Sequence, residues 1–435
     1  STQGVSSAAS DVYKRQQFVK DEGKAMQDMM WPRQDANIMD YGKESLYKFN
    51  LKCSGNVSEN FSKFGDVFFK AAHVITEYIL ERQRIGELDC YFFPVAYLYR
   101  HSLELKLKAI AFKYIEDSGE IFIKETFHNL IKILEYIEPF IRDEINTDED
   151  AYLWMKALFE DMNPIDKDSD AFRYPFKIEI RKDEVWGDKQ YTIKKFFEGQ
   201  KHINLIAFAN KMEIVFDILC SYYENKKKRY EEYKKYNTVF LEEGGEYYCQ
   251  SVIGYDYSKA FYGPMVKGYS ESAEYLGDLI IGDSKLKETY FFPMCYLYRN
   301  ALELELKQIW FEECAFGFQE RCKKLSKSKH SFEKLWNMIN EDLIRHSQGE
   351  GDKSVITYAE RYILQINALD SSSSVFRYPV NKYGRYHFVK NKYVDARNVG
   401  EFFKEISEFL QCVDMMMDDH NQCLADMAAE YADYY

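Results

Sequence analysis

The sequence predicts an all-α protein with small β-hairpins, organised as two tandem helical-bundle repeats. One observation is an internal repeat: residues 91–108 return as residues 290–307 with 13 of 18 positions identical. Another is that two shorter blocks recur in the same order, 128–132 as 330–334 and 172–175 as 376–379. The third is the three- and four-residue spacing of apolar residues along most of the chain, which is typical of amphipathic helices. The chain therefore contains the same domain twice.

Length and composition set the broad class. A chain of 435 residues suits two lobes of about 200 residues each. Hydrophobic residues make up 46%, only 8 prolines occur, and no apolar run approaches 18 residues, which favours a globular helical protein without a membrane span. Nine cysteines without a C-x-x-C pair indicate reduced thiols in the cytoplasm. A net charge of −13 argues against a general nucleic-acid binder, so RNA binding would need a local basic patch.

Ten helices are expected in chain order. Each copy supplies five, at 61–84, 92–114, 130–142, 151–162 and 203–223, and again at 269–281, 291–316, 332–344, 355–369 and 399–420. Short alternating stretches follow each Phe-Arg-Tyr-Pro block and predict hairpins or extended arms, at 177–182 with 191–195 and at 386–389. Asp395 is the expected cap of the last helix.

These elements predict six segments. Residues 1–16 resemble translated adapter sequence and are expected to be non-native, and residues 17–56 form an N-terminal extension. The repeats are placed at 57–225 and 256–420, the joining segment at 226–255, and a C-terminal tail at 421–435. The basic run 226–229 predicts a linker helix, which is either a solvated charged face or a nucleic-acid contact, before a hinge at Gly244 and Gly245.

One face of the repeated helix is retained in both copies. At 100° per residue, six positions fall within about 100° of arc on the helix. They are Phe93, Tyr97, Arg100, Glu104, Leu107 and Lys108, repeated as Phe292, Tyr296, Arg299, Glu303, Leu306 and Lys307. Three of the five positions that differ, 95, 102 and 106, lie on the opposite side, which is expected to face water.

The retained charges allow two interpretations. If the row is buried among aromatic residues, removing one member strands a charge, and its retention is purely structural. Alternatively, Arg100 and Arg299 reserve their planar donors for a phosphate or carboxylate ligand, with Glu104, Lys108, Glu303 and Lys307 beside them.

Two further blocks carry candidate site residues. His128 and His330 open the next helix, where each either caps or packs against the first turn or acts as a general acid or base. Arg173 with Tyr174 and Arg377 with Tyr378 precede prolines that stiffen the chain, so each arginine is either a clamp on Glu104 or Glu303 or a second anion donor. Within each copy, the arginine of the row, the glutamate, the histidine and this second arginine are expected to converge.

The sequence carries none of the common motifs of phosphate-binding, hydrolase or metal sites. The sequence has no Gly-rich phosphate loop, no H-E-x-x-H, no G-x-S-x-G and no histidine pair at ligand spacing on one helix. We therefore expect neither a metal nor a cofactor.

The motifs Tyr-Arg-His-x-Leu-Glu-Leu-x-Leu-Lys, a later histidine before a helix, and Phe-Arg-Tyr-Pro resemble an uncharacterised bacterial group of helical proteins related to the HEPN superfamily. HEPN domains are helical bundles that pair face to face, and active members are metal-independent ribonucleases of toxin and defence systems. The signature of the active members is an arginine, usually followed by a polar Asn or His, and then a histidine a few residues later. Arg100-His101 and Arg299-Asn300 match its first half. Leu105 and Leu304 stand near where its closing histidine would fall.

The resemblance implies two repeats packed as an internal pseudo-dimer that binds RNA or a nucleotide, with metal-independent RNA cleavage as the activity. His128 or His330 would then remove the ribose 2′-hydroxyl proton, and Arg100 and Arg299 would neutralise the phosphate. His101 joins the binding residues in this interpretation. The alternative is a non-enzymatic interaction or scaffold protein that contacts a protein partner and uses the charged row structurally.

Overall fold

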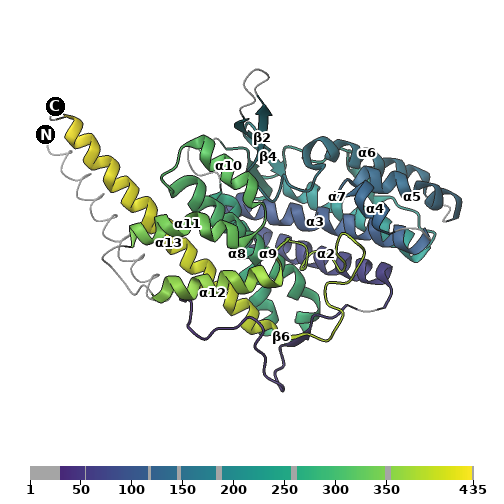
Figure 1. The fold of residues 1–435 in the computed structure, drawn as a ribbon. Coiled ribbons are helices and arrows are strands. Elements are labelled where there is room, and N and C mark those ends of the chain that lie inside the picture. The colour runs from purple at the N-terminus through teal and green to yellow at the C-terminus, as the bar shows by residue number, and fades with distance from the viewer. Residues whose placement is uncertain are drawn as a thin grey trace.

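The protein is described by a computed structural model over residues 30–53, 55–115, 119–144, 148–182, 189–255, 262–347 and 354–433. Most of it is helical, as the periodicity predicts (Figure 1). The segment 1–16, expected to be non-native, lies outside the described residues. No helix in these ranges is long and apolar enough to cross a membrane.

The helices follow the same order in the two halves of the chain. Those of the first half are α2 (Val57–Arg82), α3 (Ile85–Tyr114), α4 (Glu120–Thr126), α5 (Leu130–Glu144), α6 (Glu149–Asp166) and α7 (Leu205–Glu224). Those of the second half are α8 (Gly263–Gly282), α9 (Lys287–Gln308), α10 (Phe318–Ser328), α11 (Phe332–His346), α12 (Ser354–Leu369) and α13 (Ala396–Asp433). All ten expected helices are present, and the short α4 and α10 are additional. A π-helical turn, Ile309–Glu313, replaces the expected continuation of α9.

Two of the three small sheets in the described residues join the two halves of the chain. Strand β1 (Lys48–Asn50) pairs with β6 (Tyr393–Asp395), and β4 (Lys201–Asn204) pairs with β5 (Gln250–Ile253), both antiparallel. Strands β1 and β5 precede the first helix of their halves, α2 and α8. Their partners β6 and β4 precede the last helix of the other half, α13 and α7. These pairings tie the halves together at both ends.

The hairpin expected after the first Phe-Arg-Tyr-Pro block is confirmed. Strands β2 (Phe176–Lys182) and β3 (Lys189–Lys195) pair antiparallel from Phe176↔Lys195 to Lys182↔Lys189. After the second block the chain forms no hairpin but an arm with one isolated bridge, Val380↔Tyr386, which leaves the alternative of an extended arm. A tight turn with Gly384 at φ 71° bends the chain, and the Tyr386 hydroxyl donates instead to the Gly55 carbonyl at 2.8 Å.

Capping residues set the helix ends and change two expected boundaries. Asp395 caps α13 as predicted, its Oδ1 accepting from the backbone N–H of Asn398 at 3.2 Å. Helix α7 stops at Glu224 because Asn225 takes the left-handed conformation, φ 55°. The expected linker helix is therefore wrong: residues 226–231 are non-helical, and the 3-10 turns Glu232–Lys235 and Tyr247–Cys249 precede β5. The expected C-terminal tail is helical as far as Asp433, because α13 continues through it.

Helices α3 and α9 lie in the centre and are buried on every side. Helices α2, α5, α7 and α8 pack on α3, while α8, α2, α11 and α13 pack on α9 (Figure 1). The expectation that positions 95, 102 and 106 face water is therefore wrong. Ser102 is 0% exposed and Lys106 is 3% exposed, and their counterparts Ala301 and Glu305 are 0% and 4% exposed. A helix enclosed by neighbours has no side on which water tolerates substitution.

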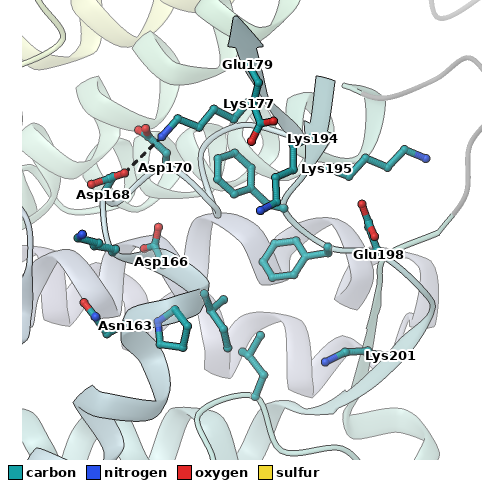
Figure 2. A pocket seen from close by; sticks show the side chains of 16 residues that line it. Asn163, Asp166, Asp168, Asp170, Lys177, Glu179, Lys194, Lys195, Glu198 and Lys201 are labelled. Atoms are coloured by element: carbon teal, nitrogen blue, oxygen red, sulfur yellow. Dashed lines mark hydrogen bonds and ion pairs between the residues drawn. The ribbon is translucent and has the colours of Figure 1, made fainter. Parts of the chain in front are cut away.

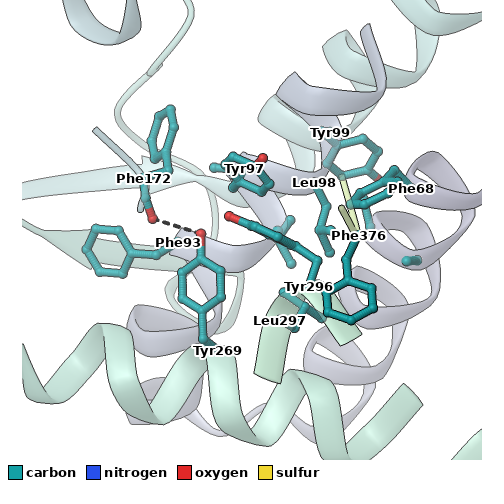
Figure 3. Packing of buried hydrophobic residues seen from close by; sticks show 14 of the residues in the cluster. Phe68, Phe93, Tyr97, Leu98, Tyr99, Phe172, Tyr269, Tyr296, Leu297 and Phe376 are labelled. Carbon is teal, nitrogen blue, oxygen red and sulfur yellow. Dashed lines mark hydrogen bonds between the residues drawn. The ribbon is translucent and has the colours of Figure 1, made fainter. Parts of the chain in front are cut away.

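Aromatic stacking and one close backbone approach join the two halves. The rings of Tyr97 and Tyr296 stack with centroids 4.6 Å apart, as Figure 3 shows. The Tyr269 hydroxyl on α8 donates to the carbonyl of Phe172 at 3.1 Å (Figure 3). Gly268 is required at the crossing of α3 and α8, because a Cβ there would lie 2.0 Å from the Cys90 carbonyl oxygen.

Candidate functional site

A buried cluster forms around Glu104 on α3. The side chains of Arg100 and Lys108 lie one helical turn before and after it, because positions four residues apart share a helix face. Arg100 Nη1 pairs with Glu104 Oε2, and Lys108 Nζ donates to Glu104 Oε1 at 2.7 Å. The side chains of these three residues are 4% exposed or less. The retained row is therefore inside the protein.

The guanidinium of Arg100 contacts Glu104, Asp166 and the backbone of His128. Its Nε lies 3.2 Å from Asp166 Oδ2 at the end of α6, and its Nη2 donates to the backbone carbonyl of His128. The carbonyl contact fixes the loop before α5. Arg100 thus positions Glu104 and the loop of His128, and its side chain is 1% exposed, so in this arrangement it contacts protein groups and not solvent.

His128 completes the cluster at its outer edge. Its Nδ1 lies 3.0 Å from Glu104 Oε1, and its side chain is 33% exposed. It does not cap α5, because that helix begins two residues later and Asn129 Oδ1 accepts from the backbone N–H of Lys132 at 3.1 Å. The retained histidine therefore serves the glutamate and not the helix end.

The second half of the chain supplies the last member. The Tyr378 hydroxyl donates to Glu104 Oε1 at 2.8 Å and lies 3.0 Å from His128 Nδ1. Tyr378 is 274 residues away from Glu104 in the chain. The cluster is therefore a composite of both halves.

A matching cluster surrounds Glu303 on α9, with Arg299 Nη1 on its Oε2. Its Oε1 accepts from Lys307 Nζ at 2.6 Å and lies 2.9 Å from His330 Nδ1, whose side chain is 36% exposed. The Tyr174 hydroxyl, from the first half, donates to the same oxygen at 2.9 Å and lies 3.1 Å from that histidine nitrogen. Each half completes the cluster of the other.

The expectation that all four residue types converge within one copy is therefore only partly right. Arginine, glutamate and histidine meet within each half, but the Arg-Tyr-Pro arm crosses to the other half. Arg173 does not clamp Glu104: its Nη2 donates to the Tyr174 hydroxyl at 2.7 Å, next to the second cluster. Arg377 Nη1 donates to the Tyr97 hydroxyl at 3.3 Å. These two arginines hold the arms in place at the junction of the halves.

His101, expected to bind a ligand, is 0% exposed. Its Nε2 lies 3.1 Å from the Arg377 carbonyl oxygen, and its ring stacks on Tyr97 with centroids 5.3 Å apart. Burial lowers its pKa well below the ordinary value. His101 is a neutral packing residue between the halves.

The carboxylates stay ionised although they are buried. Burial alone would raise the pKa of Glu104, but Lys108, His128 and Arg100 together hold that pKa well below its ordinary value. The same balance, with Lys307 as the largest of the opposing contributions, holds the pKa of Glu303 well below its ordinary value. Each cluster is thus an ion-paired network whose anion accepts from several donors.

The histidines are neutral at pH 7. Burial lowers the pKa of His128, and Lys108 and Arg377 add to this against the opposing effect of Glu104. For His330 the strongest single influence, Glu303, raises the pKa, but burial and nearby cations outweigh it and the pKa is lowered. An ionised carboxylate only accepts, so Nδ1 carries the proton and Nε2 keeps the lone pair. The two side chains are 33% and 36% exposed, and a general base requires an unprotonated nitrogen such as this Nε2.

A cavity of about 570 Å³ lies beside the first cluster, between the end of α6, the β2–β3 hairpin and β4 (Figure 2). Its wall includes Asp166, the partner of Arg100. Five lysines and five carboxylates line it, and Lys177 Nζ pairs with Asp168 Oδ2 at 3.4 Å. The cavity is charge-balanced and does not provide the basic patch that RNA binding requires.

Asp166 and Asp370 are members of the clusters that sequence reasoning missed. Asp166 Oδ2 lies 3.2 Å from Arg100 Nε, and in the second cluster Asp370 Oδ2 lies 3.5 Å from Arg299 Nε. Both stand six residues before the phenylalanine of a Phe-Arg-Tyr-Pro block, so the repeat of that block could have revealed them. Within the described ranges, no group of three or more histidine, cysteine or acidic side chains is arranged to hold a metal ion.

Neither a family model, a curated protein nor a solved structure matches this chain. What the two clusters do is therefore inferred from their own geometry.

Proposed function

We propose that residues 57–225 and 256–420 are two HEPN-like repeats packed as an internal pseudo-dimer. The common order of helices, the matching contacts of Glu104 and Glu303, and the exchanged tyrosine arms support this arrangement. Stacking between Tyr97 and Tyr296, which occupy equivalent positions of the repeated block, supports a pseudo-dimer whose axis would run between α3 and α9. Composite sites at the contact of two helical bundles fit the face-to-face pairing of HEPN domains.

We further propose that the protein binds RNA and cleaves it without a metal ion, as part of a cytoplasmic bacterial defence or toxin system. One observation carries this proposal: each histidine is held through Nδ1 by a buried glutamate and a tyrosine from the other half, and keeps a basic Nε2 on a side chain that is about one third exposed. His128 or His330 would take the 2′-hydroxyl proton, the 2′-oxygen would attack the adjacent phosphorus, and the bond to the 5′-oxygen would break, with water supplying the proton that the leaving 5′-oxygen takes up. The arginines act as positioning residues in this scheme.

The test is RNA cleavage by the full chain at low salt with a chelator present, since phosphate attraction is strongest at low salt. The informative variant is His128→Asn/His330→Asn, because an asparagine amide can still donate to Glu104 and Glu303 but cannot act as a base. Cleavage that leaves a 2′,3′-cyclic phosphate and is lost in this folded variant supports the proposal.

The chain offers a matched control in His73, whose Nδ1 lies 2.8 Å from Glu213 Oε1 outside both clusters. Its side chain is 46% exposed, so it is at least as accessible as the cluster histidines. His73→Asn should leave cleavage unchanged. Equal loss in His73→Asn would assign the activity to something other than the clusters.

A second function, a non-enzymatic interaction or scaffold protein, is favoured by the burial of the retained charges. Arg100 and Arg299 are 0% exposed, and each guanidinium contacts two carboxylates and a backbone carbonyl of the protein. Buried charges of this kind stabilise each half, and their glutamates accept from the tyrosines of the other half, without any ligand. A folded parent that neither binds nor cuts RNA at low salt would end the nuclease proposal and leave this one.

A further inference from the structure

The segment that leads to the cluster histidine differs in charge between the two copies. Residues 318–334 contain six basic and two acidic residues, whereas the equivalent residues 116–132 contain two basic and four acidic ones. Each range ends four residues after its histidine, His330 or His128. Because the chain as a whole carries a charge of −13, RNA can bind only where basic residues gather locally. The second cluster therefore has a basic approach that the first one lacks.

Helix α10 carries a row of exposed lysines along this approach. Lys323 and Lys327 are exposed and lie on the side of the helix opposite its buried residues, Cys322, Leu325 and Ser328. Since residues four apart share a helix face, the two lysines project from the same side, one turn apart. Within the described ranges neither ammonium group pairs with a carboxylate. Both charges are therefore available to an anion from solution.

The other charged side chains of α10 already have partners. Lys324 Nζ lies 3.3 Å from Glu320 Oε1, which is the carboxylate of the single acidic residue in this helix. Arg321 Nε donates to the Phe316 carbonyl at 2.6 Å. The lysine row is thus not neutralised by its own helix.

The turn between α10 and α11 places a third lysine beside the histidine. The backbone N–H that follows His330 donates to the carbonyl of Ser328 at 3.1 Å, so Lys329 and His330 are the two corner residues of the turn. Lys329 is exposed and has φ 51°, in the left-handed region where such a turn normally has glycine. Phe127 takes the equivalent conformation, φ 47°, before the first histidine. Strained backbone of this kind clusters at functional sites, and here it keeps an exposed side chain adjacent to each histidine.

We propose that Lys323, Lys327 and Lys329 bind phosphates of an RNA strand and lead the strand to His330. This inference rests on the nuclease function proposed above and assigns most of the cleavage to the second cluster. His330 would take the 2′-hydroxyl proton, the 2′-oxygen would displace the 5′-oxygen from phosphorus, and the 5′-oxygen would take a proton from water. Lysine contacts to phosphate carry no sequence information, so binding should be independent of base sequence.

The test measures binding and cleavage separately. A fluorescein-labelled 2′-O-methyl oligouridine lacks the nucleophilic hydroxyl, so fluorescence anisotropy reports its binding to the full chain without cleavage. Lys323→Gln/Lys327→Gln/Lys329→Gln should weaken binding at low salt about tenfold or more, and should reduce the slope of log affinity against log salt by about 2, because three phosphate contacts are lost. All three side chains are exposed, so this variant should fold as the parent does.

The matched control removes the same charge from the other basic stretch. Lys227→Gln/Arg229→Gln/Lys235→Gln changes three exposed residues and should leave the affinity unchanged. Equal weakening by the two triple variants would reduce the effect to net charge and overturn the proposal. A parent that binds no oligouridine at low salt would also overturn it, as would binding of anionic phospholipid vesicles in place of the oligouridine.

Cleavage of unmodified RNA then tests the assignment of the cluster. His330→Asn should lower the cleavage rate about tenfold more than His128→Asn does, or further, because the strand is held beside His330. An equal or larger loss in His128→Asn would overturn this assignment. A parent that binds through the three lysines but cuts no RNA would end the nuclease proposal and the role of His330, while confirming the binding surface.

Discussion

Replacing Arg100 by alanine tests whether the retained row is structural. The change removes the partner of Glu104 Oε2, the ion pair with Asp166 at 3.2 Å and the donor to the His128 carbonyl. Breaking a buried pair by removing one member costs about 3–5 kcal/mol of unfolding free energy. Burial raises the pKa of Asp166 to about 6 even beside the arginine, so this carboxyl can take up a proton when stranded, and Lys108 still pairs with Glu104. We therefore expect a loss near the lower end, about 3 kcal/mol.

The assay is equilibrium urea unfolding followed by circular dichroism, with the midpoint and slope fitted separately for each transition. Arg299→Ala should lose a similar amount. Arg84→Ala is the control, because Arg84 pairs with Glu87 at 2.9 Å while 63% exposed, and such a surface pair contributes less than about 1 kcal/mol. An Arg100→Ala loss no larger than that of Arg84→Ala, or a gain in stability, would refute the structural role and favour a ligand site.

Three further outcomes are expected. Gly268→Ala should destabilise the protein by about 1–3 kcal/mol, because α8 must move away from α3. Gly263→Ala has open space around it and should leave the stability unchanged; equal effects in urea unfolding would refute the close approach. Burial raises the pKa of Glu305 from 4.5 to about 8, so the folded state holds this proton more tightly than the unfolded state. The free energy of unfolding should therefore fall as the pH rises from 4.5 through 8. A Glu305→Gln variant whose free energy of unfolding falls equally with pH would contradict this. Nitrogen NMR should find Nδ1 protonated at pH 7 in His128 and His330, with pKa values below 6.5, and a value above 6.5 would remove the general base.

The sequence predicts the helices well because their apolar spacing is regular. It misses α4 and α10, which have only 7 and 11 residues, and the end of α13, whose residues are exposed from position 422 to 432 and form no buried stripe. It also assumes that a central helix keeps one side in water. Neighbours surround α3 completely, so Ser102 and Lys106 are buried although they differ between the copies.

The members of the clusters are predictable because the repeat compares two copies of each position. Arg100, Glu104 and His128 were correctly placed together on this basis. A repeat shows which residue types are kept but not which copy supplies them, so the crossing of Tyr174 and Tyr378 between halves was not predictable. That crossing depends on how the two bundles pack, which no local pattern encodes.

The most direct test of the composite clusters is a pair of double-mutant cycles. Tyr378→Phe combined with Glu104→Gln removes a hydrogen bond to a buried ionised group between the halves, and the coupling energy in urea unfolding should be about 1.5–3 kcal/mol. Tyr174→Phe combined with Glu104→Gln probes the tyrosine of the same half and should couple by less than about 0.5 kcal/mol. Strong coupling of Glu104 to Tyr174 with none to Tyr378 would contradict the exchange of arms between the halves.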